Sequence, residues 1–374
     1  MKWLWIQAED VWLFRDGKPF SAGDDHSAHS MFPPTPLTVQ GSLRAEISQQ
    51  EGVTFHEYVQ QKTTRSHEVA NLIGPPTKDE EQLSTGTFKM RGPFVGRASE
   101  NGYDLLTPAP ADLVGNADGT SLTFAPLHKA SFRHNLTHPT IQYFPRIPSG
   151  CEQLAGHWLD SDNFQAYLDG DVPHKAWKSN KLYEAENRFG VAIDAQTSYR
   201  EEGQLYQVQF VRPKIDMGLL VSVDDASGKY FKGERSISIG GEQKRAIIKS
   251  TDAVFEAQHR VDEDDEYFKL VFLTPAYFKQ GWLPASDWSQ WLGGVELIAA
   301  ALYSPMKIGG WNTARRMPRP IHRYIAPGSV YYFRRTGELK EIPNAVTESP
   351  SDIADAAAIG FGQFALGSLS YMHE

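Results

Sequence analysis

The chain has little cysteine and no long apolar run. Its 374 residues contain a single cysteine, Cys151, so neither an intrachain disulfide nor a cysteine-based zinc cluster can form. No stretch of about 18 consecutive apolar residues occurs, which argues against a membrane span. The apolar residues 1–6 are followed at once by Glu9 and Asp10, so this segment is too short for a signal peptide. We therefore expect a cytoplasmic protein that does not cross a membrane.

Basic residues are fewer than acidic residues, and the charges are unevenly distributed along the chain. The formal net charge is −9, which by itself argues against a stand-alone nucleic-acid-binding protein. Residues 305–340 nevertheless hold eight basic residues against one acidic residue, a net charge of +7. Residues 262–266, by contrast, form a solid acidic block. This distribution suits a protein that touches nucleic acid on one face only.

The opening stretch, residues 12–44, combines a proline-rich loop with a helical pattern. Three prolines within residues 33–36 exclude a helix there, because proline fixes φ and removes a backbone donor. Beyond them Val39, Leu43 and Ile47 recur at i, i+4 and i+8, which predicts one apolar stripe of a helix.

This helix is expected to begin near Thr38 and to carry an anion site. Gly41 and Ser42 would then fall in its first turn or two, where free N–H groups and the positive end of the helix dipole favour an anion. Arg44 adds a permanent cation. The segment therefore predicts a phosphate-binding helix start.

The rest of the chain alternates strand and helix patterns. Strand patterns occupy residues 2–7, 205–212, 217–223, 267–275 and 329–334, a hairpin pattern residues 92–108, and helical patterns residues 162–168, 295–302 and 353–359. Each half thus reads strand, helix, strands, helix, strand. We predict an α+β protein of two ferredoxin-like (RRM-type) domains, residues 1–225 and 226–374, with loop and hairpin insertions. The duplication rests partly on the resemblance described below.

The basic segment contains a tryptophan beside paired glycines. Trp311 follows Gly309 and Gly310, and arginines come shortly after it. Such a group can offer a stacking face together with phosphate contacts. The alternative is a buried tryptophan among solvated arginines, and the +7 excess favours RNA binding.

A glycine-rich loop lies near the C-terminal end, with glycines at positions 360, 362 and 367. Glycine lets backbone N–H groups approach phosphates, and equally allows a tight turn from a helix into a strand. Both interpretations stay open, the turn being the commoner use.

Asp24, Asp25, His26 and His29 invite two enzymatic interpretations, a metal site or a general base for RNA cleavage. No specific ligand spacing surrounds them, and a polar loop naturally collects such residues. The chain also lacks a P-loop, a dinucleotide fingerprint and a nucleophile elbow. We therefore expect no metal, no cofactor and no catalytic residue.

Several motifs, in order, carry a family resemblance. They are Phe-Arg-Asp-Gly-Lys-Pro-Phe, Phe-Pro-Pro-Thr-Pro, Gly-Ser-Leu-Arg, Gly-Pro-Phe, Glu-Asn-Arg-Phe-Gly, Gly-Gly-Glu, Leu-Thr-Pro-Ala, Gly-Gly-Trp and the final glycine loop. Together they resemble a RAMP-superfamily subunit of the type III-B (Cmr) CRISPR effector, the one that binds the 5′ tag of the crRNA.

The resemblance implies a non-catalytic role in antiviral defence. It implies that the chain holds the repeat-derived 5′ tag and docks on the large polymerase-like subunit and on the first backbone RAMP subunit. Phosphate contacts would give affinity, and pockets for splayed bases would give register. The residues expected to bind RNA are Arg15, Gly41, Ser42, Arg44, Lys129, Arg133, Lys307, Trp311, Arg315, Arg316, Arg319, Gly360, Gly362 and Gly367.

Two other functions stay open. The first is a metal-independent endoribonuclease that matures crRNA, with His26 or His29 as the base. The second is a purely structural adaptor whose tryptophans and acidic block serve protein contacts.

Overall fold

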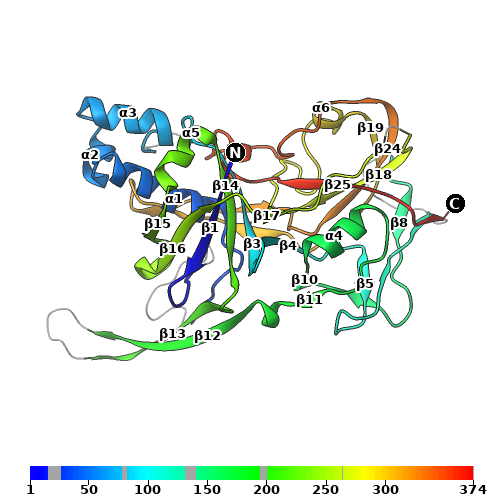
Figure 1. Ribbon diagram of the computed structural model, residues 1–374, viewed down its shortest axis with the longest axis horizontal. Helices are drawn as coiled ribbons and strands as arrows, with labels where there is room; N and C mark the ends of the chain where they lie inside the picture. Colours follow the sequence, from blue (N-terminus) through cyan, green and yellow to red (C-terminus); the bar gives the residue numbers. More distant parts are fainter. Residues whose placement is uncertain (16–26, 78–81, 131–139, 194–199, 263, 374) are drawn as a thin grey trace.

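Two antiparallel sheets dominate the computed structural model, which describes residues 1–15, 27–77, 82–130, 140–193, 200–262 and 264–373 (Figure 1). The first sheet contains, in spatial order, β11 (Trp177–Lys178), β10 (His157–Leu159), β4 (Gly102–Pro108), β3 (Met90–Ser99), β14 (Met217–Val223), β1 (Lys2–Ala8), β16 (Arg245–Thr251) and β15 (Glu234–Ser238). A short strand, β17 (Val254–Phe255), pairs with β4 in parallel. Mostly antiparallel sheets with few helices agree with the α+β prediction.

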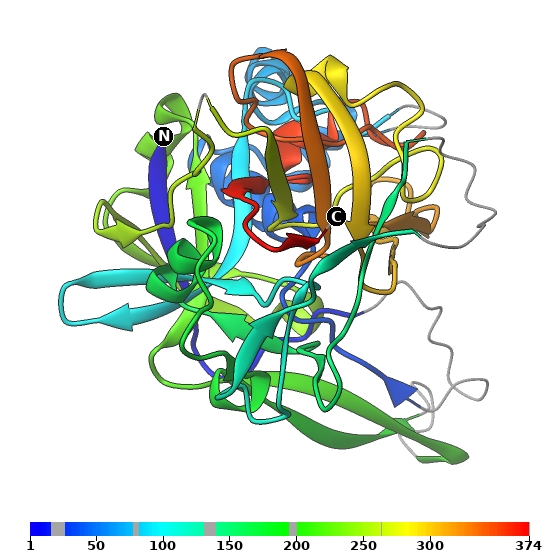
Figure 2. The ribbon, with the colours of Figure 1, turned by 90° about the vertical axis from the view of Figure 1, so that its right-hand side faces the viewer.

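The second sheet has the order β19 (Gly293–Ala301), β24 (Val330–Leu339), β18 (Tyr267–Phe272), β25 (Phe364–Ser368). In Figure 2 these strands run side by side, from red β25 through β18 and orange β24 to yellow β19. The α-helices are α1 (Pro36–Gln50), α2 (Phe55–Gln60), α3 (Thr64–Ile73), α4 (Ser161–Leu168), α5 (Asp225–Gly228), α6 (Ser289–Leu292) and α7 (Ala356–Ile359). No helix of the described residues is long and apolar enough to cross a membrane.

A long two-stranded ribbon and several short strands lie outside the two main sheets. A long ribbon, β12 (Tyr183–Ile193) with β13 (Arg200–Pro213), extends away from the body at the lower left of Figure 1. The remaining short strands are β2 (Ser27–Ala28), β5 (Leu113–Gly115), β6 (Leu122–Phe124), β7 (Leu127–Lys129), β8 (Tyr143–Pro145), β9 (Glu152–Gln153), β20 (Met306–Ile308), β21 (Trp311–Asn312), β22 (Met317–Pro318), β23 (His322–Tyr324) and β26 (Met372–His373).

Both faces of each main sheet are buried. One face of the first sheet, with Leu4 and Leu219, packs against Leu43 of α1. Its other face includes Trp5 and shares one apolar cluster with Tyr332 of the second sheet. Alternate residues along a strand point to opposite faces, so each strand serves two cores.

The strand order repeats in the two sheets. In the first sheet the order β16-β1-β14-β3, with α1 between β1 and β3 along the chain, matches β25-β18-β24-β19 in the second. The predicted domain boundary after residue 225 stays a prediction. It separates β16 from its neighbour β1, whereas a boundary after β17 would keep the first sheet whole.

Most strand predictions are confirmed, and one helix prediction is wrong. The patterns at residues 2–7 and 217–223 become β1 and β14, and the hairpin pattern becomes β3 with β4. Residues 295–302, expected to be helical, form the edge strand β19. Both faces of β19 are buried, with Val295 in one core and Ala299 in the other, so its apolar run shows no alternation.

A buried polar cluster joins the second sheet to the insertion that follows β4. Asp112, fully buried, accepts hydrogen bonds from the hydroxyls of Tyr167, Tyr332 and Tyr371. Lys269 is also fully buried, and its Nζ lies 3.6 Å from the ring centroid of Tyr167. Desolvation lowers the pKa of Lys269 to about 7, and the Asp112 carboxylate opposes that shift.

Candidate nucleic-acid interface

The first part of the basic segment, residues 305–324, forms a hairpin between β19 and β24. Its base is the pair β20 and β23, and its outer part is the pair β21 and β22. The turn between β21 and β22 is closed by Asn312, whose Oδ1 accepts the Arg315 N–H at 3.1 Å. Arg316 has a φ of +54°, in the left-handed region. We call residues 305–324 the basic hairpin.

The tip of the basic hairpin is exposed, aromatic and cationic. The Trp311 side chain is 59% exposed and Met317 is 40% exposed. Arg315 and Arg316 are exposed as well, and neither forms an ion pair with another described residue. An accessible indole beside two unpaired guanidinium groups can stack on a base and bind phosphates.

A second pair of cations lies at the base of the basic hairpin. Lys307 and Arg323 are directly opposed across β20 and β23, and both are exposed without an ion-pair partner among the described residues. Like charges opposed across a sheet destabilise it, so an anion bound between them would relieve the repulsion. Arg323 was counted in the sequence as part of the +7 excess but was not singled out. That Arg323 lies opposite Lys307 can be seen only once the register of the hairpin is known.

Arg319 differs from the other arginines of the basic hairpin. Its side chain is only 11% exposed, and its Nη1 lies 3.3 Å from Oδ2 of Asp352. Its predicted phosphate contact is therefore not open in this structure, because the guanidinium already faces a carboxylate.

The start of α1 lies next to the basic hairpin. Leu37 of α1 and Met306 of β20 pack on the same apolar cluster, whose members include Ile308 and Tyr324. Two segments that are some 270 residues apart in the sequence thus meet at one place.

The anion site predicted at Gly41 and Ser42 is corrected by the helix start. Because α1 begins at Pro36, both residues lie in its second turn, where backbone N–H groups bond to carbonyls within the helix. The Ser42 hydroxyl donates to the Thr38 carbonyl. The first turn offers no row of free N–H groups either, because Pro36 has none and the Thr38 and Val39 N–H groups both bond to the Thr35 carbonyl.

Arg44 points into the protein. Its Nη2 donates to the Tyr58 hydroxyl at 2.7 Å and to the Gly74 carbonyl at 3.4 Å. Burial lowers the pKa of Arg44, and Tyr58 opposes that shift. These contacts tie α1 to α2 and to the end of α3, which gives Arg44 a structural role here.

Two further predicted residues, Arg15 and Lys129, do not join the basic hairpin, and a third lies outside the described residues. Arg15 is exposed beside Ser30, to which its backbone is bridged. Lys129 is exposed at the end of β7, which pairs with β8 and β26. Arg133 lies outside the described residues. The RNA-binding role of all three stays a prediction.

The glycines of the C-terminal loop are buried and tightly packed. Gly360 ends α7 with a φ of +107°, and a Cβ there would lie 2.2 Å from the Gly92 carbonyl oxygen. A Cβ on Gly362 would lie 2.5 Å from the Val346 oxygen. Gly367 sits in β25, close to the backbone of α4. The turn interpretation accounts for these glycines, and phosphates have no access to them in this structure.

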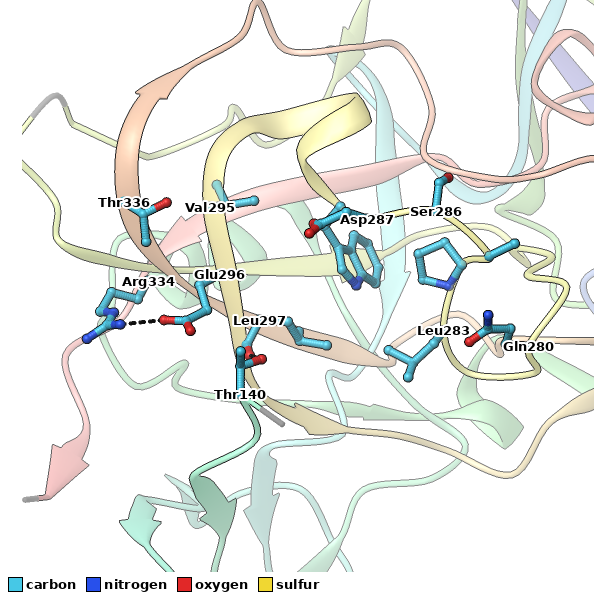
Figure 3. Close-up of a pocket in the computed structure, with 13 residues that line it drawn as sticks. Thr140, Gln280, Leu283, Ser286, Asp287, Val295, Glu296, Leu297, Arg334 and Thr336 are labelled. Atoms are coloured by element: carbon cyan, nitrogen blue, oxygen red, sulfur yellow. Dashed lines mark hydrogen bonds and ion pairs between the residues drawn. The ribbon is translucent and has the colours of Figure 1, made fainter. Parts of the chain in front are cut away.

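A pocket of about 550 Å³ lies elsewhere, beside α6 (Figure 3). Leu283 and Leu297 line it, and Arg334 of β24 pairs with Glu296 of β19 at its rim. None of the residues predicted to bind RNA lines this pocket. We therefore leave it outside the candidate interface.

Of residues 24–29, which could hold a metal site or a general base, the structure describes residues 27–29. His29 is exposed, whereas Asp24, Asp25 and His26 lie outside the described residues. Among the described residues, no group of three or more histidine, cysteine and acidic side chains could hold a metal ion.

Comparison with known proteins identifies the family. The model of the family described as CRISPR-associated protein (Cas_Cmr3) matches residues 4–369. The chain belongs to the Cas_Cmr3 family. The predicted resemblance to a CRISPR-associated subunit is thus confirmed at the level of the family, and the binding of the crRNA 5′ tag stays a prediction.

One solved structure shares the fold of this Cmr3-family chain. A chain in a cryo-EM structure of the type III-B Cmr-beta complex bound to cognate target RNA and AMPPnP is similar, with a TM-score of 0.51 and 16% identity over 88% of this chain and 86% of that one. A chain of a Csm3-Csm4 subcomplex has a TM-score of 0.38 and 12% identity, over 91% and 96%. No curated protein matches the chain.

Proposed function

We propose that the chain is the non-catalytic, RNA-binding subunit of a type III-B CRISPR effector that holds the 5′ tag of the crRNA. The observation that carries the proposal is the tip of the basic hairpin. There an indole and two unpaired guanidinium groups are exposed together in a protein of net charge −9. Aromatic stacking and phosphate neutralisation are the two interactions on which single-stranded RNA binding depends.

The RNA path would run along the basic hairpin towards the start of α1. Trp311 would stack on one unpaired base while Arg315 and Arg316 bind the flanking phosphates. Lys307 and Arg323 would continue this cationic track.

The repeated strand order supports two ferredoxin-like units in this subunit. Among the four matching strands of each sheet, the first and third along the chain are central neighbours, and a helix follows the first strand. This is the arrangement of a split β-α-β unit. The hairpin would then be an insertion in the second unit.

The proposal includes two protein partners, the large polymerase-like subunit and the first backbone RAMP subunit. Family membership and the fold shared with a chain of the Cmr-beta complex support assembly with other subunits. The acidic residues 262–266 lie on a different part of the chain from the basic hairpin, which leaves room for protein contacts alongside RNA.

Crosslinking of tag RNA in the reconstituted complex tests the proposal. Photoreactive nucleotides in the tag are expected to crosslink to residues 305–324 of this chain. Crosslinks confined to other subunits, with assembly dependent on the arginines of the basic hairpin, would instead identify a structural adaptor.

A cleavage assay tests the non-catalytic part. Incubation of the isolated chain with repeat-containing RNA is expected to give no products, and His26→Ala/His29→Ala is expected to leave the complex fully active. Products formed by the unmodified chain and absent with the double variant would identify an endoribonuclease.

A further inference from the structure

Asp352 holds the basic hairpin from the loop that precedes α7. Its Oδ1 lies 2.9 Å from Nε2 of His322, and its Oδ2 lies 3.3 Å from Nη1 of Arg319. One carboxylate thus contacts two side chains of the returning half of the hairpin. All three are largely shielded, at 18% exposure for Asp352 and His322 and 11% for Arg319.

The Asp352 backbone is itself fixed to the N-terminal half of the chain. Its carbonyl accepts the Leu83 N–H at 2.9 Å, and the Ala354 N–H donates to the Leu83 carbonyl at 2.9 Å. Gln82 donates through Nε2 to the Ser351 carbonyl. The loop therefore offers a fixed carboxylate to the hairpin.

The basic hairpin needs such a support. Its two ladders contain only three and two residue pairs, and an isolated two-stranded ribbon is marginally stable. Gly309 and Gly310 join β20 to β21, and glycine permits a wide range of backbone conformations. Nothing in the ladders alone fixes the direction in which the tip points.

We infer that Asp352 is a positioning residue for RNA binding, which acts by orienting the basic hairpin through Arg319 and His322. The inference rests on the proposed function. Arg319 then serves RNA binding without touching RNA, because its guanidinium is engaged with the carboxylate. Once oriented, Trp311 and its neighbouring arginines are presented together.

The sign of one mutational effect separates this role from simple electrostatics. Replacing Asp352 with alanine removes a negative charge and frees Arg319, so electrostatics alone predicts tighter RNA binding. Loss of orientation predicts weaker binding, since apparent affinity scales with the fraction of molecules in the competent conformation. A hairpin oriented only a tenth to a fifth of the time would bind about fivefold to tenfold more weakly.

The test is a double-mutant cycle on the full chain, with a fluorescent single-stranded RNA of the crRNA 5′ tag as the probe. Asp352→Ala is expected to weaken binding about fivefold to tenfold. In a chain that already carries Trp311→Ala, Arg315→Gln and Arg316→Gln, the same change is expected to have no further effect. Asp252→Ala, which removes an exposed carboxylate paired with Lys2, is the charge control and should not weaken binding.

Each outcome decides a different claim. An equal loss in both backgrounds, or unchanged or tighter binding by Asp352→Ala, would overturn the positioning role and leave the proposed function standing. If the triple variant itself binds tag RNA as tightly as the unmodified chain, the proposed function fails. Should Asp352→Ala not fold, Asp352→Asn keeps one acceptor oxygen and is expected to show a smaller loss of the same sign.

Discussion

Replacing Arg315 and Arg316 with glutamine is expected to flatten the salt dependence of RNA binding. Each phosphate contact to single-stranded RNA contributes about −0.7 to the slope of log affinity against log salt. Two contacts therefore contribute about −1.4, which corresponds to about tenfold in affinity at 0.15 M salt and vanishes towards 1 M. Arg319 is left out of the variant, because Asp352 engages it.

The matched control removes two charges from the other end of the same basic segment. Arg334→Gln/Lys340→Gln changes one cation in the middle of β24 and one just beyond its end; Arg334 pairs with Glu296, and Lys340 donates to the Gln290 carbonyl. Fluorescence anisotropy with tag RNA from 0.05 to 1 M salt (about a 20-fold range) gives both slopes. An unchanged slope for the tip variant, or equal flattening by the control, would refute phosphate binding at the tip.

Five other substitutions test the remaining assignments. Trp311→Ala is expected to weaken RNA binding by about 1–3 kcal/mol at every salt concentration in the same titration, because stacking does not release counterions; a changed slope would argue against stacking. Arg44→Ala should lower the free energy of unfolding in urea by about 1–3 kcal/mol through its lost hydrogen bonds, with RNA affinity unchanged. Gly360→Ala should destabilise by about 1–3 kcal/mol, whereas Gly41→Ala, in open space on α1, should stabilise by about 0.5–1 kcal/mol. The pKa of Lys269 is about 10.5 in the unfolded chain and about 7 in the folded chain. Between pH 7.5 and 9.5 only the unfolded chain therefore holds this proton, so the free energy of unfolding should rise by about 1.4 kcal/mol per pH unit. Lys269→Met should remove this pH dependence.

Local pattern was enough for several elements of the fold. Alternation identified residues 205–212, which lie in β13, and flanking glycine and proline identified the hairpin of β3 and β4. It failed for β19, because a strand buried on both faces has the same apolar run as a buried helix. Composition likewise located the basic segment, although not its shape.

The site residues show where sequence reasoning ends. Arg319 and Arg315 contribute the same charge to the basic segment, and nothing in the sequence around them tells them apart. Arg319 is shielded because it contacts Asp352, which lies 33 residues further along the chain, whereas Arg315 is exposed. Arg44 is assigned by Tyr58 and Gly74, which lie 14 and 30 residues away. A pattern read from neighbouring residues cannot predict contacts between residues so far apart in the sequence. The order of the motifs indicated the family. The role of each residue, by contrast, follows from its contacts in the folded chain.

The apolar cluster shared by the two sheets has a consequence for dissection of the protein. Trp5 of β1 and Leu220 of β14 belong to the same buried cluster as Val271 and Tyr332 of the second sheet. A fragment that ends after β16 would present this face to water, and so would its complement. Fragments of either half would therefore be prone to aggregate, and thermal unfolding of the whole chain should be a single cooperative transition.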